Sequence, residues 1–309
     1  MEEKNEKVTM GYVEACNFIK QYMKSEKKSQ VQVAKELDVS PSRLSGFLSG
    51  TYAAPHTVIS AVEELAAISE QKKAAPKEPE YAETTVNRMV TNAIRYAHLQ
   101  GKLSVAYGDA GIGKTMAFRN YLEKNAMAVG ITISPVYSSV AGVLEKLSEQ
   151  MGVHERVARK QTAEIINRLR GSGKVLVVDE AQHLTPRALD HLRCIADESG
   201  VGLCFIGNEE VYSKLKGGGD EKFAQLFSRL GMKPHVLVSD ITREDVRAVF
   251  GKYVTEENAL ELLFRICRTA YGMRGAVNVF VNTINAFQEI TSQGLTRMMR
   301  EMDIVERGR

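Results

Sequence analysis

A glycine-rich loop at residues 108–115 constrains the fold of this chain more than any other feature. Its sequence, Gly-Asp-Ala-Gly-Ile-Gly-Lys-Thr, fits the pattern G-x-x-x-x-G-K-T, in which backbone N–H groups close around phosphate oxygens. Residues 102–107 before the loop predict a strand, and residues 115–124 after it predict a helix. Phosphate would then lie at a helix N-terminus, which favours anions. The alternative is a chance glycine turn, which this strand-and-helix context disfavours.

The loop predicts a site for a nucleoside triphosphate and Mg²⁺. Lys114 would contact the β- and γ-phosphates, and the hydroxyl of Thr115 would bind the metal ion. We expect the whole loop and the residue after it to contact the nucleotide. These residues are Gly108, Asp109, Ala110, Gly111, Ile112, Gly113, Lys114, Thr115 and Met116.

An acidic pair follows a second buried strand, which is predicted at residues 175–179. The carboxyl ends of strands are where ligands bind in open α/β sheets. Asp179 would hold Mg²⁺ directly or through water, and Glu180 would orient and deprotonate the attacking water. The alternative is a strand that ends in two solvated acids. Together with the loop, the pair predicts nucleotide hydrolysis.

Three further residues are candidates for phosphate chemistry. Asn208 follows a strand predicted at 203–207 and would hydrogen-bond the γ-phosphate or the water; the alternative is a plain helix N-cap. Phosphoryl transfer also needs positive charge in the transition state. Arg229, after the apolar residues of 223–227, is the candidate arginine finger, or else a surface arginine. Arg274 is a possible γ-phosphate sensor in the same chain.

The chain has 309 residues, which is too long for one typical core. Residues 1–70 predict a small all-α domain, and 71–83 a polar, proline-broken linker. Residues 84–240 alternate strands with helices, the signature of a parallel α/β sheet, with further strands expected at 129–134 and 235–238. From 241 to 309 the pattern is helical only.

Composition excludes several classes of protein. With 44% hydrophobic and 26% charged residues, the chain is typical of a globular protein. Its apolar runs are too short to span a membrane, and the polar N-terminus does not resemble a secretory signal. The four cysteines are scattered, which predicts reduced cysteines in a cytoplasmic protein rather than a disulfide or zinc framework. The net charge of +3 does not by itself indicate nucleic acid.

Two regions are candidates for DNA contact. Helices predicted at 30–37 and 41–48, joined by a tight turn, suggest a helix-turn-helix in which Ser42 and Arg43 would reach bases or phosphates. The alternative is a protein–protein adaptor, and residues 1–80 carry 11 basic and 12 acidic residues, so they lack the basic surface typical of a strong phosphate binder.

The second candidate is a basic stretch at 154–174. We expect a helix there with Val157/Ala158, Ile165 and Leu169 inside, so that basic residues face outward along a DNA path. The residues we assign to DNA contact are Arg156, Arg159 and Lys160. A merely solvated helix face is the alternative.

The combination of these motifs resembles a known family, the bacteriophage Mu-type B transposition proteins, and more broadly the AAA+ target-selection ATPases of bacterial transposons. The resemblance rests on the helix-turn-helix, the loop at 108–115, Val-Val-Asp-Glu-Ala-Gln-His-Leu at 177–184, Gly207-Asn208 and Phe-Ala-Gln-Leu-Phe-Ser-Arg at 223–229. It covers roughly residues 10 to 290.

The resemblance implies an AAA+ fold and a function. The sheet would have the fifth strand beside the first, then the fourth, third and second, with a C-terminal helical lid. ATP would drive assembly into an oligomer, a helical filament or ring, on double-stranded DNA; the assembly would recruit and stimulate a transposase, and hydrolysis would dissolve it. Arg229 matches the family's finger, which acts on a neighbouring subunit. The lid's sensor arginine falls near Asn278 in one alignment and on Arg274 in another.

Two alternative functions remain open from the sequence. One is an ATP-dependent loader of a replicative helicase, which has a similar core. The other is a DNA-binding regulator in which nucleotide only switches the oligomeric state. Glu180 disfavours the second alternative, because a pure switch needs no general base.

Overall fold

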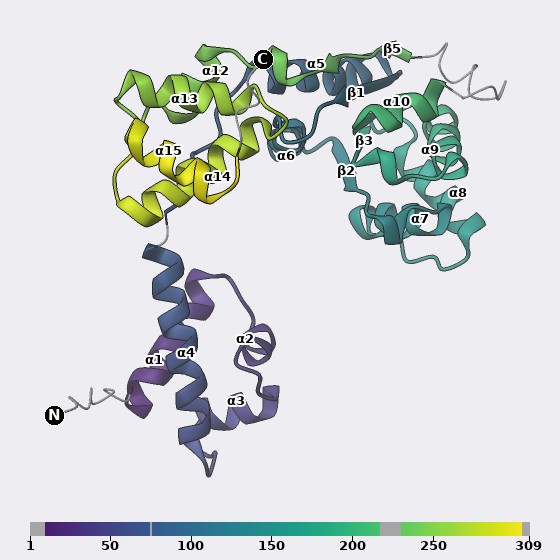
Figure 1. The fold of residues 1–309 in the computed structure, drawn as a ribbon. Coiled ribbons are helices and arrows are strands. Elements are labelled where there is room, and N and C mark those ends of the chain that lie inside the picture. The colour runs from purple at the N-terminus through teal and green to yellow at the C-terminus, as the bar shows by residue number, and fades with distance from the viewer. Residues whose placement is uncertain (1–9, 75, 217–229, 305–309) are drawn as a thin grey trace. The chain divides into compact units, whose positions relative to one another are not determined.

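The computed structural model describes residues 10–74, 76–216 and 230–304 (Figure 1). It divides the chain into two compact units between Pro76 and Lys77. Each unit has its own hydrophobic core. No helix within the described ranges is both long and apolar enough to cross a membrane.

Within its described residues, the first unit has four helices: α1 Tyr12–Ser25, α2 Gln30–Glu36, α3 Pro41–Leu48 and α4 Pro55–Ala74. Serine N-caps begin α2 and α3, since Ser29 accepts from the backbone of Gln32 and Ser40 from that of Arg43. Asp38 makes the turn between them in a left-handed conformation, φ 51°. The core residues include Ala15, Ile19, Val33, Ala34, Leu44, Phe47, Val58 and Val62. The predicted helix-turn-helix is therefore present.

The predicted linker at 71–83 begins too early, because α4 continues to Ala74. Gln, Lys and Ala at 71–74 are good helix formers, and Pro76 is the first residue that disfavours a longer helix. Residues 78–84 belong to the second unit, where most of them line a cavity beside the loop at 108–115. The sequence pattern alone did not indicate that part of this stretch packs on the second unit.

The second unit is built on a parallel sheet with the strand order β2-β3-β4-β1-β5, which confirms the order that the resemblance implied. The strands are β1 Leu103–Gly108, β2 Ala128–Thr132, β3 Val175–Asp179, β4 Gly202–Gly207, β5 Leu230–Met232 and β6 His235–Val236. β5 and β6 both pair with β1, and β5 was not predicted. Pro234 lies between them; it has no N–H, but its carbonyl accepts from Tyr107 N at 3.1 Å.

Both faces of the sheet are buried. Val175 and Val177 of β3 face the core shared with α5 (Thr85–Gln100) and α6 (Lys114–Lys124). Leu176 and Val178 face the opposite core. That second core is covered by α7 Val140–Met151, α8 Ala158–Leu169, α9 Pro186–Ser199 and α10 Glu209–Lys216. The alternation explains why the strands are almost entirely apolar.

The C-terminal part is a bundle of helices, as predicted (Figure 1). Its members are α12 Arg243–Phe250, α13 Glu257–Cys267, α14 Gly272–Phe287 and α15 Ser292–Glu301. A capping box formed by Thr242 and Asp245 begins α12. Phe250, Leu263 and Phe280 are buried in the core that this bundle shares with one face of the sheet. The bundle is therefore packed against the nucleotide-binding core as a lid.

Candidate functional site

A cavity of about 530 Å³ lies where the loop, the strand ends and the lid meet. Residues 110–116 of the loop line it, with Asp179 and Glu180 after β3, Asn208 after β4, and Arg274 of α14. The volume lies in the range of pockets that hold small ligands. Two motifs that are far apart in sequence are thus brought into one site.

The loop takes a conformation that glycine permits. Gly113 has φ 106° and Gly108 has φ 140°. A Cβ on Gly108 would lie 1.8 Å from the carbonyl oxygen of Val236, so the close approach of loop and β6 requires glycine there. Gly108 and Asp109 do not line the cavity. Instead, Asp109 Oδ2 accepts from Val238 N at 2.8 Å and anchors the loop to the chain after β6.

Lys114 is half-buried at the centre of the site. Its Nζ donates to the carbonyl oxygen of Gly108 at 3.0 Å and to that of Asp109. Burial lowers the pKa of Lys114, and the nearby negative charges of Glu180 and Asp179 oppose this. A triphosphate would supply the negative charge that such a desolvated ammonium group favours.

The residues beside Lys114 fit a magnesium ion. Asp179 is 2% exposed, and its Oδ2 has no hydrogen-bond partner among the described residues. Burial raises the pKa of Asp179, while the neighbouring Thr115 hydroxyl opposes the rise. A hard cation prefers such oxygen ligands. The described residues contain no cluster of three His, Cys, Asp or Glu side chains that could hold a metal alone, so phosphate and water would complete the coordination.

Glu180 has a strained backbone. Its φ of 56° and ψ of 36° lie in the left-handed region, which non-glycine residues rarely adopt. Gln182 Nε2 donates to the Glu180 carboxylate. Strain of this kind costs on the order of 1–3 kcal/mol and is concentrated at functional sites. The turn places a carboxylate, already held by a hydrogen bond, at the cavity wall.

The residues predicted to contact the γ-phosphate differ in their positions and hydrogen bonds. Asn208 lines the cavity and also caps α10, because its Oδ1 accepts from Glu210 N at 2.9 Å. Its predicted role and the N-cap alternative are therefore compatible. Arg274 and Asn278 both line the cavity, and the backbone N–H of Arg274 donates to Gly111 O at 2.8 Å. Arg229 lies outside the described residues.

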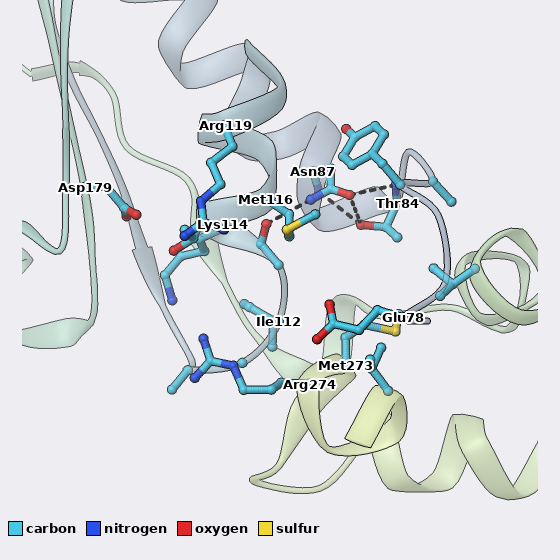
Figure 2. A pocket seen from close by; sticks show the side chains of 18 of the residues that line it. Glu78, Thr84, Asn87, Ile112, Lys114, Met116, Arg119, Asp179, Met273 and Arg274 are labelled. Carbon is cyan, nitrogen blue, oxygen red and sulfur yellow. Dashed lines mark hydrogen bonds between the residues drawn. The ribbon is translucent and has the colours of Figure 1, made fainter. Parts of the chain in front are cut away.

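Several cavity residues were missed by sequence reasoning. Figure 2 shows Thr84 and Asn87 on one side of the cavity and Met273, beside the predicted Arg274, on another. Apolar lining residues that the sequence did not predict include Ala82, Val249, Met273 and Val277. They come from three separate segments, and nothing in their local patterns distinguishes them from ordinary helix or linker residues. Only the tertiary packing of the lid reveals them.

The candidate DNA residues are all exposed. Ser42 and Arg43 lie in the first turn of α3, where the Arg43 guanidinium lies 5.6 Å from the centre of the Tyr52 ring. Arg156 precedes α8, and Arg159 and Lys160 lie in its first turn.

The prediction that Val157 and Ala158 are inside was wrong. α8 begins only at Ala158, so Val157 is outside the helical repeat and is 58% exposed. Ala158 is exposed as well. The buried face of α8 consists of Ile165, Ile166 and Leu169.

Comparisons with known proteins agree with this architecture. Residues 97–215 match the model of an AAA domain, and residues 19–70 match a helix-turn-helix model. A crystal structure of Cdc6p from Pyrobaculum aerophilum superposes with a TM-score of 0.55 at 15% identity, covering 73% of this chain and 69% of that chain. That similarity concerns the fold alone.

Two curated relatives extend over most of the chain. The Mu-like prophage FluMu DNA transposition protein B of Haemophilus influenzae is 31% identical over 268 residues, 84% of this chain and 92% of the relative. The ATP-dependent target DNA activator B of Escherichia phage Mu is 29% identical over 261 residues, 82% of each chain. The protein therefore belongs to the family of Mu-like DNA transposition proteins B, with a helix-turn-helix domain followed in sequence by an AAA ATPase domain.

Proposed function

We propose that this protein is an ATP-dependent DNA-binding ATPase that assembles on double-stranded DNA, selects target DNA and stimulates a transposase. The observation that carries the proposal is the single cavity that joins Lys114 and Thr115 of the loop to Asp179 and Glu180. Family membership supplies the process, since the phage Mu relative is named an ATP-dependent target DNA activator. The helicase-loader alternative has no comparable support among these relatives.

Each residue has a role that follows from its position. Lys114 and the loop amides bind the β- and γ-phosphates, and the apolar lining around Met273 packs against the base. Bound Mg²⁺, held by Thr115 and Asp179, would neutralise charge that develops on the phosphates. Glu180 orients the attacking water and accepts its proton. Asn208 and Arg274, which both line the cavity, donate to the γ-phosphate.

The start of α8 supports DNA contact. A helix N-terminus favours acidic residues, yet the first turn of α8 contains none and carries Arg159 and Lys160 instead, with Arg156 just before. Within the described part of the chain, none of these three side chains has a hydrogen bond or an ion pair. Such uncompensated positive charge fits a polyanion, and phosphate contacts account for most non-specific DNA affinity.

We further propose that a neighbouring subunit completes the site. Arg229 supplies the finger, a contribution of about 10³–10⁵ in rate when it is provided in trans. Oligomerisation on DNA would then couple assembly to hydrolysis. We place this assembly on DNA in the bacterial cytosol, where its phage and prophage relatives would act.

ATP turnover with and without duplex DNA tests the proposal. We expect DNA to stimulate hydrolysis by the wild-type protein, and Lys114→Ala to abolish turnover because phosphate binding is lost. The matched control is Lys124→Ala, at the exposed far end of α6, which should retain wild-type turnover. Wild-type protein that binds DNA but does not hydrolyse ATP would instead support the nucleotide-switched regulator.

A further inference from the structure

Asn87, in the first turn of α5, lines the cavity and contacts the phosphate loop. It is 3% exposed and both ends of its amide group are used. Oδ1 accepts from Thr84 N at 3.2 Å and from Thr84 Oγ1 at 2.9 Å, while Nδ2 donates to Gly113 O at 2.9 Å. Figure 2 shows these bonds. The amide orientation is fixed by its partners, since Thr84 N–H can only donate and the Gly113 carbonyl can only accept.

The bond to Gly113 determines where a loop amide points. In a trans peptide the C=O and the following N–H point in opposite directions. Holding the Gly113 carbonyl against Asn87 therefore aims the Lys114 N–H away from α5, toward the phosphate side of the loop. Gly113 has φ 106°, and glycine tolerates many backbone conformations, so the peptide needs such a constraint. Ala117 N, at 3.1 Å, provides the only other hydrogen bond to this carbonyl among the described residues.

The same end of α5 is bonded to the lid. Asp245 of α12 is 4% exposed, and its Oδ1 accepts from Thr85 N at 2.7 Å and from Thr85 Oγ1 at 3.1 Å. Its Oδ2 accepts from Thr242 N at 2.9 Å, at the start of α12. Thr85 follows Thr84, the partner of Asn87. Hydrogen bonds on either side of the covalent Thr84–Thr85 link thus connect the lid through the first turn of α5 to the loop.

We propose that Asn87 is a positioning residue for the phosphate loop and that Asp245 couples it to the lid. The position of α12 would then adjust the first turn of α5, and through Asn87 the orientation of the Gly113–Lys114 peptide. The inference rests on the proposed binding of nucleotide phosphates at this loop. Its consequence is that movement of the lid changes the affinity of the loop for phosphate through Asp245, which does not line the cavity.

Titration of the full-length protein with fluorescent ATP and ADP analogues tests the positioning role. Asn87→Ala should raise both dissociation constants about tenfold, the usual effect of one lost hydrogen bond, while turnover at saturating ATP stays within about twofold. The control Thr185→Ala removes a comparable helix N-cap, that of α9, away from the cavity. It should lower the melting temperature and leave both dissociation constants unchanged.

A second substitution covers the case in which Asn87→Ala fails to fold. Asn87→Asp keeps the oxygen that caps α5 and replaces only the donor to Gly113. Its added charge also repels phosphate, and because position 87 is buried salt screens that repulsion only weakly. The repulsion is stronger for ATP than for the less charged ADP, whereas the loss of the donor weakens the binding of both. We therefore expect weaker binding of ADP as well as of ATP.

A double-mutant cycle tests the coupling. Asp245→Asn retains the side-chain shape and should raise the dissociation constants several-fold. If the two residues act in series, Asn87→Ala combined with Asp245→Asn should bind nucleotide no more weakly than Asn87→Ala alone. Effects that multiply would overturn the coupling, and an unchanged affinity in Asn87→Ala would overturn the positioning role. A wild-type protein that binds no nucleotide would instead overturn the proposed function.

Discussion

Glu180 combines two features that a general base requires. Its left-handed backbone conformation turns the side chain out of β3 immediately after the buried Asp179, and Gln182 holds its carboxylate by a hydrogen bond. The two neighbouring acids therefore occupy different environments, one buried beside Thr115 and the other at the cavity wall. This difference supports a division of roles, with the metal at Asp179 and the water at Glu180.

Replacing the base should separate binding from hydrolysis. Glu180→Gln keeps the shape of the side chain and its ability to accept a hydrogen bond, so ATP and DNA binding should survive. Hydrolysis should fall by about 10²–10⁴, the usual contribution of a general base. Stopped-flow dissociation should then reveal a long-lived ATP–DNA complex. Glu123→Gln, on the exposed surface of α6, is the control; a Glu180→Gln complex that dissociates as fast as the control would contradict the assignment.

The sequence predicted the residues whose chemistry lies within one continuous motif. Lys114, Thr115, Asp179 and Glu180 were assigned because each motif carries both its secondary structure and its functional group. Asn87 could not be predicted in this way. Its partner Gly113 lies in another element, and a buried asparagine in a first helical turn has the pattern of an ordinary cap.

Among the lid helices, α14 contacts the loop directly. A Cβ on Gly272 would lie 2.9 Å from the carbonyl oxygen of Gly111, and Arg274 N donates to the same carbonyl group. The start of this lid helix therefore packs directly on the turn of the loop. A side chain at position 272 must push the two apart.

Gly272→Ala should weaken nucleotide binding through this contact. We expect the Michaelis constant for ATP to rise several-fold as α14 moves from the loop. The matched control is Gly200→Ala at the end of α9. The backbone φ is 73° at Gly200 and 60° at Gly272, but a Cβ added at Gly200 would have no atom within 4 Å. Both variants carry the backbone strain, so only the contact differs. Equal Michaelis constants in the two variants would exclude a role for the contact.

The start of α8 should contribute to DNA affinity. Combined replacement of Arg156, Arg159 and Lys160 by alanine should weaken binding to duplex DNA for all sequences alike. Each lost phosphate contact should reduce the slope of log affinity against log salt by about 1. ATP turnover without DNA should not change. The control is Arg168→Ala, at the other end of α8, where Arg168 is paired with Glu164. If the triple variant shows an unchanged slope of log affinity against log salt, the DNA path lies elsewhere.

Element boundaries were predicted best where strong local signals begin or end them. Pro41 after Ser40 fixed the start of α3, and the predicted strand at 175–179 coincides with β3. β5 was missed because only three residues form it and its pairing with β1 is entirely non-local. The start of α8 was misplaced because Val157 is apolar, although it precedes the helix and is exposed.

At the scale of the whole molecule, the chain joins a helix-turn-helix unit to an AAA unit, and the sequence predicted both fold classes. Each has a separate core, so the first unit is not needed to bury the sheet of the second. ATP chemistry and helix-turn-helix DNA contact are therefore assigned to different units. What connects them in function, on this account, is assembly of many subunits along one DNA duplex.

Electron microscopy of the full-length protein on long duplex DNA tests whether ATP drives this assembly. Three samples are compared at equal protein concentration: with ATP, with ADP and without nucleotide. We expect continuous protein coverage of the DNA with ATP and bare or sparsely covered DNA in the other two samples. Equal coverage of the DNA in all three samples would contradict this expectation.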